Sequence, residues 1–152
     1  MRYAAIVGVS LSLLVVCLSA QEQPAKEQVL RFEEASVKRN DSGDLRASYR
    51  TFPNGWEGKN VSLHLVICVG YNLLLDQLVG GPDWVRTEKW DVRGTAGRES
   101  NVGQVPGMVR TLLAERFRLV VHTEPRDVLF EPTRSMTGVL VVIDSVERPT
   151  PD

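Results

Sequence analysis

Residues 60–84 read NVSLHLVICVGYNLLLDQLVGGPDW, and this stretch decides the fold class. Its apolar residues recur at the three- and four-residue spacing of one helix face, with more apolar residues between them, so more than one face is expected to be buried. Asn60 or Ser62 can cap the start of such a helix. The Gly-Gly-Pro at 80–82 ends it, because glycine permits positive φ and proline cannot continue a helix. The stretch predicts a buried helix that runs to Leu78 and packs against a sheet.

Short strands are predicted on both sides of this helix. Residues 90–95, WDVRGT, alternate apolar and polar side chains, which is typical of a half-buried strand. Residues 32–38 and 56–61 have similar β-like character. Residues 39–55 are rich in turn-forming residues and are expected to be mostly loop, with at most a short strand.

A second amphipathic helix is predicted from about Pro106, since proline is well placed in a first helical turn. Alternating residues predict a strand over 116–122, and the apolar run from Val139 predicts a last strand over 139–146. Helices interleaved with short strands favour an α+β fold. We expect a small two-layer sandwich, with a short, mostly antiparallel sheet and two main helices packed on one of its faces.

The amino-terminal residues predict export. Arg2 precedes an apolar run over residues 4–18, and Ser19-Ala20 follows, which is the pattern of a signal peptide cleaved after Ala20. A retained membrane anchor is the alternative, but the run is shorter than the roughly 20 residues that a spanning helix needs. Lipidation at Cys17 is a lesser alternative. Residues 21–28 are then a flexible lead-in, residues 29–152 a single domain, and the protein periplasmic or extracellular.

Composition excludes several classes of protein. The chain has 18 basic and 19 acidic residues, and loss of Arg2 with the signal peptide leaves 17 basic ones. This balance argues against a nucleic-acid partner, which selects for a strongly basic surface. Cys68 is the cysteine that remains after cleavage, so no internal disulfide is expected and the fold must depend on its core. Its apolar neighbours favour a buried thiol.

Four motifs resemble a known family. They are FEEASVK at 32–38, NVSL at 60–63, GGPDW at 80–84 with WDV at 90–92, and LLAERFRL at 112–119 with His122 and Arg126. They resemble the large Soli-type family of uncharacterised exported proteins, best known from acidobacteria, over about residues 30–128. Trp90 stands where phenylalanine is usual. The resemblance implies no established activity. Some members are fused to BlaR-type sensor metallopeptidases, which implies a sensing or interaction role by association alone.

The carboxyl-terminal region departs from the pattern of that family. Its members usually continue after the equivalent of Val128 with a further strand, a glycine-containing loop and a helix, whereas here residues 129–133 and 139–149 resemble the closing motif directly. The copy is therefore expected to be internally shortened, with an irregular junction over 128–138. A sheet short of one strand exposes an edge, so self-association, or strand addition by a partner, is predicted near residues 128–143.

The candidate binding residues are Asp83, Trp84, Trp90, Arg116 and His122. Tryptophan beside aspartate can line a sugar or peptide groove; alternatively, Asp83 bonds its own backbone in a turn and the tryptophans close the core. Arg116 is expected on a solvated strand face or paired with a carboxylate. His64 and Cys68 share a helix face and supply two ligands at most, so no metal and no cofactor are predicted.

Three functions remain open from the sequence. The first is a non-catalytic extracytoplasmic module for binding, sensing or protein interaction, with a protein or small ligand of the cell envelope as its partner. The second is a small extracytoplasmic hydrolase that uses His122 with a carboxylate, although no nucleophile elbow, HExxH or P-loop motif is present. The third is a truncated paralogue without function.

Overall fold

Two β-sheets and three α-helices make up the part of the chain that the computed structural model describes, residues 29–97, 100–130 and 134–149. The elements are β1 (Glu34–Arg39), β2 (Ser48–Phe52), β3 (Gly55–Ser62), α1 (Leu63–Tyr71), the 3-10 turn η1 (Leu75–Gln77), β4 (Leu78–Gly80), α2 (Trp84–Thr87), β5 (Lys89–Thr95), the 3-10 turn η2 (Val102–Gln104), α3 (Val105–Phe117), β6 (Val120–Phe130) and β7 (Arg134–Ser145). The predicted signal peptide and lead-in, residues 1–28, lie outside the described residues.

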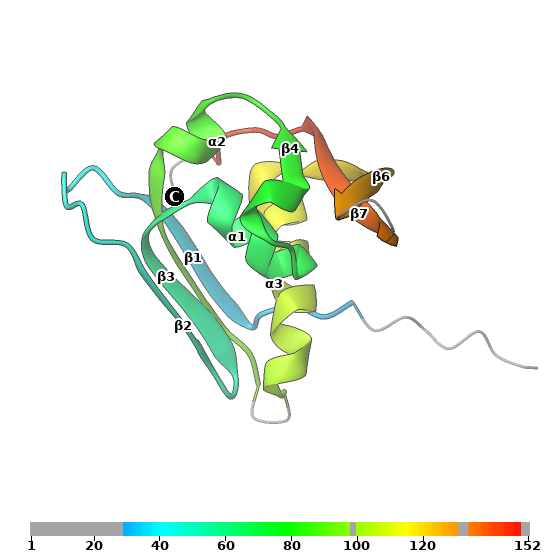
Figure 1. Ribbon diagram of the computed structural model, residues 1–152. Helices are drawn as coiled ribbons and strands as arrows, with labels where there is room; N and C mark the ends of the chain where they lie inside the picture. Colours follow the sequence, from blue (N-terminus) through cyan, green and yellow to red (C-terminus); the bar gives the residue numbers. More distant parts are fainter. Residues whose placement is uncertain (1–28, 98–99, 131–133, 150–152) are drawn as a thin grey trace, which may run out of the picture.

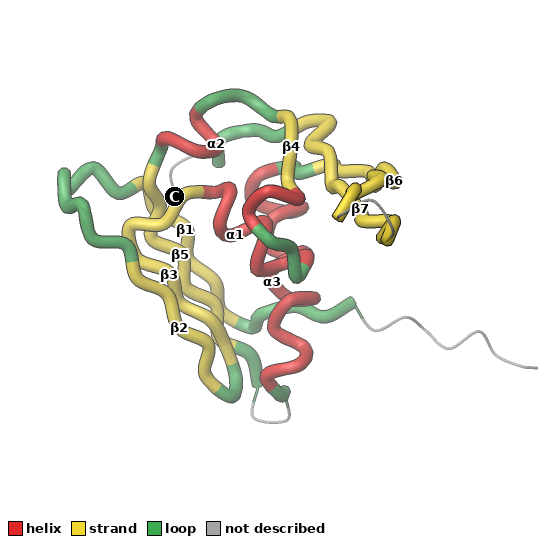
Figure 2. The backbone as a smooth tube through the Cα atoms, in the orientation of Figure 1, coloured by secondary structure: helices red, strands yellow, loops and turns green. Residues whose placement is uncertain are grey.

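The predicted α+β class is confirmed, but the strands form two sheets instead of one. Strands β1, β5, β3 and β2 make an antiparallel sheet in that order, and β4, β7 and β6 make a second one in which β4 and β7 are parallel. Helices α1 and α3 cover one face of the four-stranded sheet, and the three-stranded sheet lies beyond them (Figures 1 and 2). The helices therefore pack between two sheets.

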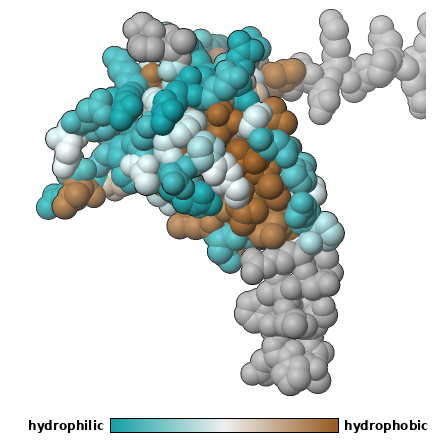
Figure 3. Space-filling view, turned by 90° about the horizontal axis from the view of Figure 1, so that it is seen from above, coloured by the Kyte–Doolittle hydropathy of each residue, from teal (hydrophilic) through white to brown (hydrophobic). Residues whose placement is uncertain are grey.

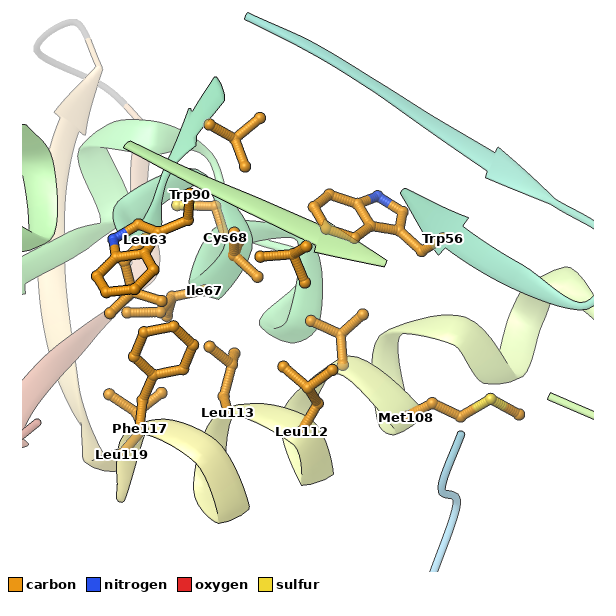
Figure 4. Packing of buried hydrophobic residues seen from close by; sticks show 14 of the residues in the cluster. Trp56, Leu63, Ile67, Cys68, Trp90, Met108, Leu112, Leu113, Phe117 and Leu119 are labelled. Carbon is orange, nitrogen blue, oxygen red and sulfur yellow. The ribbon is translucent and has the colours of Figure 1, made fainter. Parts of the chain in front are cut away.

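One continuous hydrophobic core joins these layers. Trp56 and Trp90 enter it from the first sheet, and Val141 and Ile143 enter it from the second. Figure 4 shows side chains of α1, such as Ile67, directed toward those of α3, such as Leu113 and Phe117. Gly70 lies where the two helices touch, and a Cβ added there would come within 3.2 Å of Val109. A Cβ at that point would press on Val109 and Leu113, so glycine favours the close approach of the helices.

The first helix is shorter than its apolar pattern predicts. Ser62 caps its start by accepting a hydrogen bond from the N–H of Leu65, as expected of one of the two candidate caps. The helix ends at Tyr71, because Asn72 adopts the left-handed conformation with φ of 53°. Asparagine tolerates this conformation better than most residues, and it terminates helices in the way that glycine does. The prediction of a helix running to Leu78 is therefore wrong.

A second boundary also differs from the prediction. Residues 116 and 117 belong to the last turn of α3, and Arg118 ends the helix in a left-handed conformation with φ of 49°. Strand β6 starts only at Val120. The alternation of Phe117, Leu119 and Val121 suggested a strand over 116–122. Phe117 instead belongs to α3 and is buried in the core as a helix residue. Alternation over so few residues is compatible with a helix end followed by a strand.

The predicted irregular junction over 128–138 is wrong for the residues that the structure describes there. Strands β6 and β7 pair in register from His122↔Val142 to Phe130↔Arg134, so they form a long hairpin. Strand β7 is also paired on its other side, with β4, over Val141–Ile143. The edge strands of this sheet are β4 and β6, and β7 extends beyond the three residues that pair with β4. Within the described ranges, no helix is long and apolar enough to cross a membrane.

Candidate functional site

Trp84 and Trp90 lie together in the fold. Their ring centroids are 6.4 Å apart in an edge-to-face arrangement, and Trp90 makes a second such contact with Phe117 at 5.3 Å. Trp90 is buried and Trp84 is half-buried. Asp83 is exposed at the start of α2 and its side chain makes no capping hydrogen bond. The tryptophans thus form an aromatic ladder from the surface into the core.

The outer tryptophan of this ladder is covered by the carboxyl-terminal segment of the chain. The guanidinium carbon of Arg148 lies 4.8 Å from the ring centroid of Trp84. The same guanidinium donates to both carboxylate oxygens of Glu88, at 2.8 to 3.2 Å. These hydrogen bonds lower the pKa of Glu88, and the nearby charges of Arg148 and Arg39 act in the same direction. A tryptophan already stacked under an arginine offers little surface to a ligand, which favours a structural role.

Arg116 and His122 do not join the tryptophans. Arg116 is exposed in the last turn of α3 and lines a small hollow of about 130 Å³ with Arg31 and Glu115. His122 is exposed on β6, in the other sheet. The five sequence-predicted residues are therefore distributed over separate surfaces, and a binding role for them remains a prediction.

His122 does contact carboxylates, as the hydrolase alternative requires. Its Nδ1 lies 2.7 Å from Oδ1 of Asp144, and its Nε2 lies 3.1 Å from Oε1 of Glu124. The hydrogen bond with Glu124, followed by that with Asp144, raises the pKa of His122 above its usual 6.5. A raised pKa keeps the ring protonated to higher pH, and a protonated ring cannot accept a proton as a general base. This geometry disfavours the hydrolase.

The described part of the structure also contains a groove that none of the predicted residues lines. It has a volume of about 660 Å³, within the roughly 300–1,000 Å³ typical of ligand sites. We call it the β2 groove. The residues that line it are Tyr49, Thr51, Leu65, Cys68, Val69, Asn72, Leu73, Leu74, Leu75, Val102, Gly103, Val105 and Pro106.

The walls of the β2 groove come from elements far apart in the sequence. Tyr49 and Thr51 lie on one face of β2, which is the edge strand of the four-stranded sheet. The facing wall is the end of α1 with the segment that follows it, and η2 with the first turn of α3 closes one end. Strand β2 lies at the border of the sheet, beside the helical layer that covers the other strands (Figures 1 and 2). The inner face of β2 consequently borders the groove.

The β2 groove is apolar and exposed to solvent. Tyr49, Leu74, Leu75 and Val102 are each more than half exposed. Hydrophobic side chains also gather in a band on the face seen from above, where hydrophilic side chains border them (Figure 3). Clustered exposed apolar side chains mark interaction sites in soluble proteins. In the β2 groove, these side chains line a concave surface.

The electrostatics of the β2 groove favour an uncharged occupant. No lining residue among those described carries a formal charge, and Cys68 lies at its base as a buried residue. Burial raises the pKa of the Cys68 thiol to about 11, so the thiol is neutral at physiological pH. A neutral thiol is a poor nucleophile and a poor metal ligand. The groove is consequently suited to binding apolar groups and not to chemistry at Cys68.

Sequence reasoning missed the β2 groove, although one signal was available. Leu73, Leu74 and Leu75 follow Asn72, and three successive apolar residues in a segment that leaves a helix cannot all turn inward. Assigning them to a longer helix concealed their exposure. The contribution of β2 had no comparable signal, because residues 39–55 were expected to be mostly loop.

Comparisons with known proteins give one match. No curated protein and no solved structure matches the chain. Residues 64–130 run from the first turn of α1 to the end of β6, so they include the helical wall of the β2 groove but not β2 itself. These residues match the model of a family described as protein of unknown function (DUF3738), which supports an uncharacterised domain family for this part of the chain.

Proposed function

We propose that this protein is an exported, non-catalytic binding module whose binding surface is the β2 groove. The observation that carries the proposal is the concentration of exposed apolar side chains around one concave, uncharged surface. A soluble domain gains stability by burying such side chains, so their exposure here is consistent with a partner that covers them. Sensing and protein interaction are both uses of such a module.

Binding at the groove can be tested with the neutral, environment-sensitive dye Nile red. Leu74→Glu places a charge in the groove, and Val120→Glu places the same charge on β6, outside it. Both native side chains are more than half exposed, so neither variant should impair folding. We expect the fluorescence enhancement to be lost in the Leu74 variant and retained in the Val120 variant. Equal binding by both variants, or no binding by the native protein, would refute the groove as the binding surface.

Export is proposed on the sequence pattern of residues 1–20. Mass spectrometry of the protein released from the periplasm or medium should show an amino terminus near Gln21. Recovery of the chain with an intact Met1, or retention of a lipid at Cys17, would reject cleavage after Ala20. The result is independent of the dye experiment, so the location and the binding surface are tested separately.

A further inference from the structure

We propose that the β2 groove receives an extended peptide segment of a partner protein, which adds to β2 as a fifth strand and alternates apolar with acidic side chains. This inference rests on the proposed binding function and specifies the partner. Three observations support it: β2 has an unpaired edge, hollows lie on both of its faces, and the two faces differ in charge.

The edge of β2 is available for pairing. Among the described residues, β2 pairs with β3 alone, over Ser48↔Lys59 to Phe52↔Gly55. In an antiparallel ladder, every second residue directs its N–H and C=O away from the neighbouring strand, so β2 presents unused backbone groups to solvent. Residues 48–51 are all exposed. Edges of this kind accept a further strand unless a proline, a bulge or an inward-pointing charge blocks them, and β2 has none of these.

Hollows lie on both faces of β2. On the inner face, Tyr49 and Thr51 border the β2 groove. On the outer face, a second hollow of about 310 Å³ is lined by Ser48, Tyr49, Arg50, Glu57 and Lys59. Side chains of an added strand would alternate between these two hollows, because successive residues of a strand point to opposite faces.

The two faces select different side chains. The inner face is uncharged, so the inward residues of the partner must be apolar. On the outer face, the basic residues Arg50, Lys59 and Arg93 surround one acidic residue, Glu57. The side chain of Arg50 is 72% exposed although it pairs with Glu57. Acidic residues on the outward positions of the partner would therefore meet complementary charge.

The same charges disfavour pairing between two copies of β2. Two copies that pair antiparallel about the centre of the strand would place Arg50 opposite Arg50, and like charges directly opposite each other destabilise a strand pair. A partner segment with acidic residues avoids this repulsion. We therefore assign the edge to another protein and treat self-pairing as an outcome of the test.

The test uses the purified exported protein and three synthetic peptides. One alternates valine and glutamate, one alternates valine and lysine, and one has the valines and glutamates in separate blocks. We expect the alternating acidic peptide to bind about tenfold or more tightly than either of the others. Its binding should also slow amide hydrogen exchange in β2, which distinguishes strand addition from adhesion to the groove. Equal affinity for all three peptides, or no added protection of β2, would overturn the inference.

Two variants serve as a matched pair. Thr51→Lys points a charge into the β2 groove, and Ser48→Lys adds the same charge on the outer face. We expect the first to weaken binding of the acidic peptide about tenfold or more. We expect the second to strengthen it, because a lysine on the outer face adds charge complementary to glutamate. Equal losses would overturn the assignment of the two faces. Protection of β2 in a dimer without peptide would instead assign the edge to self-pairing.

The outcome separates this inference from the function on which it rests. If Nile red binds and responds to Leu74→Glu while no peptide protects β2, strand addition fails and the binding function stands. If neither the dye nor any peptide binds, both fail.

Discussion

The backbone N–H of Asn60 donates a hydrogen bond to Oδ1 of Asp91 at 2.8 Å, at the point where the pairing of β3 and β5 becomes irregular. Asn60 is buried, and its backbone adopts the left-handed conformation with φ of 54°. Its side-chain amide donates to the carbonyl oxygens of Asp44 and Arg46, in the loop that leads into β2. Asp91 also accepts a hydrogen bond from the amide of Asn40. Together, these contacts attach the loop to the sheet and so help to position the edge strand.

Substitution of Asn60 separates two contributions to the free energy of unfolding. Asn60→Ala removes the amide hydrogen bonds, worth about 1 kcal/mol each, and adds the left-handed strain of about 1–2 kcal/mol. Asn60→Gly removes the hydrogen bonds without the strain. Urea denaturation should therefore show a larger loss for alanine than for glycine. Equal losses would mean that the backbone conformation of Asn60 contributes nothing.

Leu112 supports the core between α3 and the sheet. It is buried, so Leu112→Ala should lower the free energy of unfolding by about 2–5 kcal/mol through lost burial and the cavity left behind. Leu74→Ala is the matched control, because Leu74 is 69% exposed and its truncation should change stability by less than about 0.5 kcal/mol. Thermal or denaturant melts measure both. Similar melting of the two variants would reject the placement of Leu112.

The two histidines should titrate on opposite sides of pH 6.5. Hydrogen bonds with Glu124 and Asp144 raise the pKa of His122, whereas burial lowers the pKa of His64, and a weaker hydrogen bond with the carbonyl of Leu78 opposes that shift. NMR titration of the ring protons resolves the two groups. Asp144→Asn should lower the pKa of His122 and leave that of His64 unchanged. Two overlapping titrations near pH 6.5 would contradict both the raised pKa of His122 and the lowered pKa of His64.

These shifts have opposite consequences for stability. A raised pKa means that the folded state holds its proton more tightly, so the contribution of His122 is complete below pH 6.5 and is lost as pH rises through its folded pKa. A lowered pKa means that the unfolded state takes up the proton first. The contribution of His64 is therefore present above pH 6.5 and is lost as pH falls through its folded pKa. Denaturation across this range should show that His122→Gln removes the loss of stability with rising pH, and that His64→Gln removes the loss with falling pH.

Trp90 should tolerate phenylalanine. Its Nε1 is buried and has no hydrogen-bond partner among the residues that the structure describes, and an unsatisfied buried donor costs about 1–3 kcal/mol. Trp90→Phe removes that cost but also loses part of the buried ring. It should therefore lower the free energy of unfolding by less than Trp90→Ala, for which we expect a loss of about 3–5 kcal/mol. The edge-to-face contact with Phe117 should persist. Equal destabilisation by both substitutions would show that the indole makes an interaction that phenylalanine cannot replace.

Local patterns predicted much of the fold. The alternation over 90–95 corresponds to β5, the residues from Pro106 form α3, and Ser62 caps α1 as one of two expected residues. These features depend on side chains near one another in the chain, so a short stretch contains the necessary information. The predicted last strand over 139–146 falls within β7 except for its final residue.

Sequence patterns were sufficient to predict the α+β class and the buried faces of the two main helices. Tertiary structure alone decided where α1 ends, that the strands divide into two sheets, and that His122 meets Asp144 across a hairpin. It also decided that Tyr49 and Leu74 line the same apolar groove. The physical reason is that a helix face depends on a repeat of a few residues. A groove between an edge strand and a helix end instead depends on non-local packing, which no single stretch of the chain encodes.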